Sequence, residues 1–192
     1  MLTSEEVVSI FEKTGAMLSG HFKLTSGRHS NRYFQCAKVL QYPVHTGALC
    51  RELAARFAGE NISVVIGPAT GGIIVSYETA RAIGVRGIFT ERENGVMSLR
   101  RGFSIDPGER VLVVEDVITT GGSVLEVIDV VRSLGGIVVG AGVLVDRSGG
   151  KVDLGVKKEA LLVTETISFD LEECPLCRDG IPAVKPGSRN IK

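Results

Sequence analysis

The chain has 192 residues, 44% of them hydrophobic and 23% charged, which is the composition of a globular protein with one well-filled core. Lys and Arg number 22, as do Asp and Glu, so the formal net charge is zero. This balance excludes a global field that would attract nucleic acid or an anionic membrane, and any anion site must be built locally.

The first predicted element is an amphipathic helix. Thr3 and Glu6 have the spacing of a capping box, and Val7 and Phe11 lie on its apolar face. The N-terminus is acidic and lacks the basic start and apolar run of a signal peptide. No apolar run in the chain reaches about 18 residues, and the four cysteines do not resemble a disulfide framework. We therefore expect a cytoplasmic protein that does not interact with membranes.

Further along the chain, apolar runs of strand length alternate with helical patterns. A polar and aromatic stretch at 20–40 is expected to form loop and short strand. We then predict, in order, a helix at 44–58, a strand at 62–67, a helix at 71–84, a strand at 85–91, a hairpin or flap at 92–109, a strand at 110–116, a helix at 122–135 and a strand at 136–147. The strands are apolar on both faces, which predicts an α/β fold with a mostly parallel sheet flanked by helices.

The segment "VLVVEDVITTGGS" (111–123) places two acids at the end of a buried strand, just before a loop of Thr, Gly and Ser. In open α/β sheets, ligands bind where strands end and helices begin. Hydroxyls, backbone N–H groups and a helix N-terminus favour a phosphate monoester, and the paired glycines remove the Cβ atoms that would hold it away. Neither a Walker A lysine nor a GxGxxG pattern is present. Glu115 and Asp116 could accept hydrogen bonds from ribose hydroxyls, or could simply be solvated acids.

This segment resembles the phosphoribosyl-diphosphate signature of the type I phosphoribosyltransferases. "FKLTSGRHSNRYFQ" and "VLVDRSGG" are similar to orotate phosphoribosyltransferases in particular, and "GPATGG" (67–72) resembles their diphosphate loop. The resemblance covers nearly the whole chain. It implies one domain over 1–192, with an N-terminal hood at about 1–40, a core at about 44–165, a C-terminal tail at about 170–192 and a mobile flap.

The resemblance also implies an activity: transfer of phosphoribosyl from its diphosphate to orotate, with Mg²⁺ carried mainly by the diphosphate, in a homodimer. Arg92 and Asp116 would be catalytic, and Arg92 or flap residues would reach the other subunit's site. Arg147 would face the orotate carboxylate, a planar anion that suits a guanidinium, although it could instead form a surface ion pair. The implied substrate-binding residues are Tyr33, Phe34, Thr70, Gly71, Arg92, Glu115, Asp116, Val117, Ile118, Thr119, Thr120, Gly121, Gly122, Ser123 and Arg147.

Three positions depart from the family pattern. Several members carry lysines where this chain has Thr25, Gly71 and Glu93, so positive charge is missing around the diphosphate. The candidates to compensate are Lys23, His29, Arg100 and Arg101, of which the two arginines could equally be a solvated turn.

The histidines and cysteines give no complete metal signature. Cys174 and Cys177 form a CxxC pair, which is half of a zinc site, and neither His21 nor His29 has metal-ligand spacing with His45. We therefore expect a plain turn at the CxxC pair, with no metal-ligating residues. A Cys₄ site shared between two tails is the less favoured alternative.

Two other functions stay open at this point. A purine phosphoribosyltransferase would need neither Arg147 nor the "LTSGRHS" segment. A regulator that senses phosphoribosyl diphosphate without catalysis would fit the missing lysines, but the chain has no net basic charge and no added DNA-binding motif.

Overall fold

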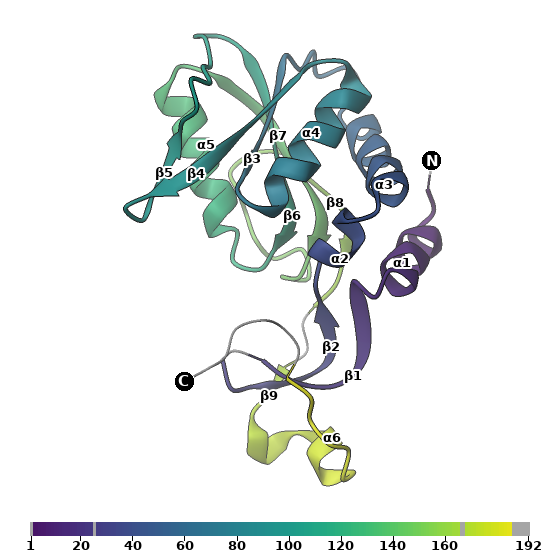
Figure 1. Cartoon of the computed structure of the whole chain (residues 1–192). Coiled ribbons are helices and arrows are strands. Elements are labelled where there is room, and N and C mark those ends of the chain that lie inside the picture. Colours follow the sequence, from purple (N-terminus) through teal and green to yellow (C-terminus); the bar gives the residue numbers. More distant parts are fainter. Residues whose placement is uncertain (1, 25, 166–167, 186–192) are drawn as a thin grey trace.

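The computed structural model describes residues 2–24, 26–165 and 168–185. Its main sheet has six strands in the order β5-β4-β3-β6-β7-β8, parallel except for β5 at one edge (Figure 1). The strands are β3 (Val64–Pro68), β4 (Arg86–Glu93), β5 (Val96–Leu99), β6 (Arg110–Ile118), β7 (Ile137–Asp146) and β8 (Lys158–Val163). The predicted α/β class is confirmed. The edge strand β8 was not predicted.

Helices cover both faces of this sheet. Alternate residues of the central strands face opposite sides, so Val65 and Leu112 belong to one apolar core, and Val64 and Val111 to the other. The first core is closed by α1 (Ser4–Lys13), α3 (Pro43–Ala55) and α4 (Gly71–Ile83), the second by α5 (Gly122–Ser133). The continuous apolar runs in the sequence therefore have a direct cause, since each central strand is buried on both sides.

The hood is a small antiparallel sheet below the main one (Figure 1). It consists of β1 (Met17–Lys23), β2 (His29–Phe34) and the two-residue β9 (Ser168–Phe169), and α2 (Ala37–Leu40) leads from it back to the core. The capping box of α1 is confirmed, with the Thr3 hydroxyl accepting from the Glu6 amide and the Glu6 carboxylate accepting from Thr3.

The C-terminal tail, described as far as residue 185, packs on the hood. A 3₁₀ turn (Leu171–Glu173) and the short helix α6 (Pro175–Arg178) follow β9, and Val184 then pairs with Phe22 of β1. The chain from β9 to Val184 thus pairs with both edges of the β1–β2 hairpin. Among the described residues, no helix is both long and apolar enough to span a bilayer.

Candidate active site

Two buried acids lie near the carboxyl end of β6. The Glu115 side chain is 8% exposed, and its Oε1 accepts a hydrogen bond from the Asp116 amide at 3.1 Å. Burial, with the neighbouring Asp116 charge as a second cause, raises the pKa of Glu115 to about 9. Burial also raises the pKa of Asp116. The unliganded pair therefore carries less negative charge than two exposed carboxylates, which favours an anionic ligand beside it.

The carboxylate of Asp116 lies directly over Gly71, the first residue of α4. A Cβ atom built on Gly71 would overlap that carboxylate, so this arrangement requires glycine at a position where the sequence analysis noted a missing lysine. The N-cap of α4 is Thr70, and no side chain caps the helix. Because β3 and β6 are neighbours, the loops that leave them bring the N-termini of α4 and α5 to the same edge of the sheet.

The loop after β6 encloses a small pocket of about 100 Å³. Gly121 has φ 79°, and a Cβ there would lie 2.7 Å from Cγ1 of Val152, so both backbone conformation and space require glycine. No side chain caps α5, which leaves its first N–H groups facing the pocket. The pocket is lined by Glu115, Val117, Ile118, Thr119, Thr120, Gly121, Gly122, Ser123 and Val124.

The hood reaches this edge of the sheet through the end of β2. The Arg147 guanidinium, just after β7, lies 5.9 Å from the centre of the Phe34 ring, and Tyr33 packs on Phe22. The Cys36 thiol is 3.9 Å from the Asp116 carbonyl oxygen. Burial raises the pKa of this thiol well above its ordinary value, so Cys36 is a poor nucleophile.

A buried ion pair fixes the turn that carries Arg147. Asp146 is fully buried, its Oδ2 lies 2.8 Å from Nζ of Lys158, and its Oδ1 accepts from the Ser148 amide and hydroxyl. Burial alone would raise the pKa of Asp146, but the bonds from Lys158 and Ser148 outweigh it and lower the pKa. The sequence analysis missed this support, because Lys158 lies on the strand it did not predict.

The arginines of the β4–β5 hairpin are engaged elsewhere in this conformation. Arg92 contacts Glu126 of α5 at 2.8 Å, and Arg100 lies 3.1 Å from Glu93. Arg101 forms a two-pronged pair with Glu91. Within its own chain, Arg92 therefore lies outside the phosphate pocket.

The remaining positions that bear on the missing positive charge are one that lacks a lysine, Thr25, and two candidates to compensate, Lys23 and His29. Thr25 lies outside the described residues, and Lys23 is exposed on the hood. His29, a candidate to contact the diphosphate, is instead buried against His21, because it stands at the start of β2 while Tyr33 and Phe34, the predicted substrate contacts, stand at its end.

Comparison with known proteins decides the family. A family model for the phosphoribosyl transferase domain matches residues 45–173. Orotate phosphoribosyltransferase from Pelotomaculum thermopropionicum is 75% identical over 190 residues, which cover 99% of this chain and 100% of that protein. The chain belongs to the orotate phosphoribosyltransferase family. The family member from Desulforamulus reducens is 68% identical over the same shares of both chains.

Solved structures of the family share the fold. Orotate phosphoribosyltransferase from Aeropyrum pernix matches with a TM-score of 0.67 and 30% identity, over 82% of this chain and 93% of that one. The Mycobacterium tuberculosis enzyme in complex with inorganic phosphate matches with a TM-score of 0.68 and 26% identity, over 83% and 95%. The type I phosphoribosyltransferase fold expected from the sequence is confirmed.

Proposed function

We propose that this chain transfers the phosphoribosyl group of 5-phospho-α-D-ribose 1-diphosphate to orotate, giving orotidine 5′-monophosphate and diphosphate. The observation that carries the proposal is the buried Glu115–Asp116 pair ahead of the glycine loop, in a chain 75% identical to an orotate phosphoribosyltransferase. The same identity argues against the purine-transferase and sensor alternatives.

The pocket suggests how the substrate is held. The 5′-phosphate would occupy the loop 119–123, where backbone N–H groups and hydroxyls donate to it and the positive end of α5 favours its charge. The acids would then lie beside the ribose. Glu115, with a pKa of about 9, could donate its proton to one hydroxyl oxygen or lose it and accept instead. Backbone groups of Val117 and Ile118 would contact the phosphate, and backbone groups of Thr70 and Gly71 would contact the diphosphate.

The reaction would need no nucleophilic side chain. The bond from ribose C1 to the diphosphate oxygen breaks, positive charge develops on the sugar, and a ring nitrogen of orotate forms the new bond to C1. Positioning the base is then the main task. Orotate would be held by Arg147, Thr119, Tyr33 and Phe34. The Arg147 guanidinium, which lies over the Phe34 ring, would face the orotate carboxylate.

Mg²⁺ fits the same edge of the sheet. The lack of a Cβ on Gly71 makes room for the Asp116 carboxylate at this edge, and hard oxygen ligands are those that Mg²⁺ prefers. Asp116 would therefore hold the ion together with the diphosphate, and Mg²⁺ when bound would neutralise charge on the leaving group.

We place the enzyme in the cytoplasm as a homodimer. All four cysteines are free, which suits a reducing compartment. Arg92 lies on a projecting hairpin outside its own phosphate pocket, a position suited to the site of a second subunit. At that site, Arg92 would leave Glu126 and bind the diphosphate instead.

The substrate assignment is tested by supplying phosphoribosyl diphosphate and Mg²⁺ with orotate, uracil, adenine or hypoxanthine in turn and measuring released diphosphate. We expect diphosphate to be released when orotate is supplied and not when uracil, adenine or hypoxanthine is supplied. Release with a purine but not with orotate would contradict the proposal. Binding of phosphoribosyl diphosphate without release for any base would indicate a sensor.

A further inference from the structure

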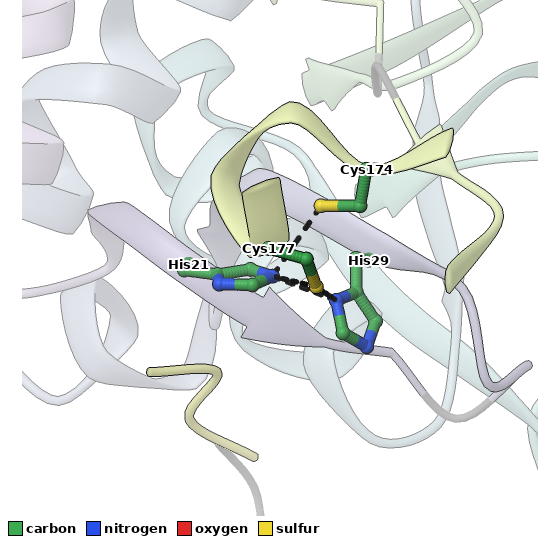
Figure 2. A group of neighbouring side chains, drawn as sticks. All are labelled: His21, His29, Cys174 and Cys177. Atoms are coloured by element: carbon green, nitrogen blue, oxygen red, sulfur yellow. Dashed lines mark hydrogen bonds between the residues drawn. The ribbon is translucent and has the colours of Figure 1, made fainter. Parts of the chain in front are cut away.

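Four potential metal ligands meet where the tail crosses the hood. His21 comes from β1, His29 from the start of β2, and Cys174 and Cys177 from the two ends of the first turn of α6 (Figure 2). One ligand atom from each lies within 4.8 Å of every other. The exposed fractions are 3% for His21, 4% for His29 and zero for Cys174, and Cys177 is half-buried, so three of the four ligands are enclosed.

Three of the distances between these atoms are those of a tetrahedral zinc site. Typical Zn–S and Zn–N bonds place neighbouring ligand atoms about 3.3 to 3.8 Å apart. Sγ of Cys174 lies 3.5 Å from Nε2 of His21, and Sγ of Cys177 lies 3.7 Å from that nitrogen and 3.3 Å from Nδ1 of His29. The two ring nitrogens are closer together, at 2.6 Å, and a bound ion would move them apart by about 0.7 Å.

The tautomer of His21 also points to a cation. Its Nδ1 lies 2.7 Å from the carbonyl oxygen of Ile181, which can only accept, so the proton is on Nδ1 and the lone pair of Nε2 faces the cluster. Metal-bound histidines are commonly oriented by such a bond from the other ring nitrogen. Without an ion, Nδ1 of His29 lies 2.6 Å from Nε2 of His21 and 3.3 Å from Sγ of Cys177, and it cannot donate to the first and accept from the second at the same time.

We propose that His21, His29, Cys174 and Cys177 bind one Zn²⁺ ion as a closed structural site. Two thiolates balance the charge of the ion, which makes its burial favourable, and binding releases the two thiol protons. Four protein ligands leave no open position for catalysis. A ligand set of two thiolates and two imidazoles also argues against Mg²⁺ and Ca²⁺, which prefer oxygen ligands.

The ion would fasten the tail to the hood. Around the cluster, His29 pairs with Phe169, the Val184 amide donates to the His21 carbonyl oxygen at 2.8 Å, and Arg28 contacts Asp170 at 2.7 Å. The cluster thereby joins segments far apart in the chain, since His21 and Cys174 are 153 residues apart in the sequence. The hood in turn carries Tyr33 and Phe34, so the zinc would stabilise the part of the enzyme that we expect to cover orotate.

The test is a Co²⁺ titration of the full, reduced and chelator-treated chain, followed by Zn²⁺ displacement and by metal analysis of the chain as purified. We expect one equivalent of Co²⁺ to give thiolate charge-transfer and tetrahedral d–d bands, and one equivalent of Zn²⁺ to abolish them. The absence of a thiolate band would overturn the proposal. Bands that survive equimolar Zn²⁺ would overturn the choice of zinc.

Matched variants locate the site. Cys177→Ser and His29→Asn should lose the one-to-one cobalt complex. Cys50→Ser and His45→Asn, which change residues outside the cluster, should keep it. Retention of the full complex in Cys177→Ser would contradict the assignment. Because the wild-type titration needs no variant, the proposal stays testable even if a substitution prevents folding.

Discussion

At the scale of single residues, the protonation of Glu115 is the most direct link between burial and function. Its pKa rises from 4.5 to about 9 in the folded chain because burial, and then the Asp116 charge, disfavour the carboxylate. The folded state therefore binds this proton more tightly than the unfolded state does. Its contribution to stability is fully present below 4.5 and is lost as the pH rises through about 9.

Glu115→Gln should remove this pH dependence. As the pH rises from about 4.5 to about 9, the free energy of unfolding of the wild type should fall relative to that of the variant, by at most about 1.4 kcal/mol per pH unit. Urea unfolding of the unliganded chains over that range measures the difference. Glu172→Gln, at an exposed acid of the tail, is the control. Parallel profiles for wild type and Glu115→Gln would show that Glu115 ionises normally.

Asp146 tests the support beneath Arg147. Asp146→Ala removes one partner of a buried ion pair and should destabilise the chain by about 3–5 kcal/mol, while Lys158 keeps only the carbonyl oxygens of Gly150 and Val152. Asp129→Ala, on the exposed side of α5, should cost no more than about 0.5 kcal/mol. Denaturant unfolding compares the two. Equal losses would mean that the ion pair does not hold this turn.

At the scale of elements, the β4–β5 hairpin carries its positive charge in paired form. If the flap closes on the diphosphate, Arg100 would have to leave Glu93, and Arg101 would have to leave Glu91, before either could bind the substrate. Glu93→Gln frees Arg100, and we expect the KM for phosphoribosyl diphosphate to fall about two- to fivefold, the range set by an exposed ion pair.

Steady-state kinetics at low and high salt measure this effect, which should shrink at high salt because exposed charges are screened. Glu172→Gln should leave KM unchanged. A KM that rises in Glu93→Gln would indicate that Glu93 assists binding.

The core elements were predictable because their signals are local. Apolar runs that end at Gly67–Pro68 or begin after Gly136 mark buried strands, and the Asn94–Gly95 turn marks the hairpin. Strand β8 was missed because "KEALLV" begins with two charged residues. One of them, Lys158, forms an ion pair with the buried Asp146.

The His/Cys cluster was not predicted because its spacing exists only in three dimensions. The turn between β1 and β2 places Lys23 opposite His29, which puts His21 on the same face of the sheet as His29. The chain must then leave the end of β8 and fold back along the hood to deliver Cys174 and Cys177. The available signal was a CxxC pair combined with two histidines that flank "FKLTSGR".

At the scale of the whole molecule, the proposed homodimer makes a prediction about mixed subunits. If Arg92 serves the partner's site, Arg92→Ala and Asp116→Asn should each be inactive alone. After mixed refolding they should regain about one quarter of wild-type activity, since half of the dimers are hybrids and each hybrid has one intact site. Orotate consumption before and after mixing measures this. No recovery despite hybrid formation would place Arg92 in its own subunit's site.

The central claim, an orotate phosphoribosyltransferase site built on Glu115–Asp116 and Arg147, is tested most directly by one assay. The initial rate of orotate absorbance loss with phosphoribosyl diphosphate and Mg²⁺ is compared for wild type, Asp116→Asn, Arg147→Ala and the exposed control Arg132→Ala. We predict consumption by wild type and Arg132→Ala and at least about a hundredfold loss in the other two, the scale expected when a positioning or charge-stabilising group is removed. Wild-type rates in Asp116→Asn and Arg147→Ala, or no orotate consumption by the wild type, would contradict it.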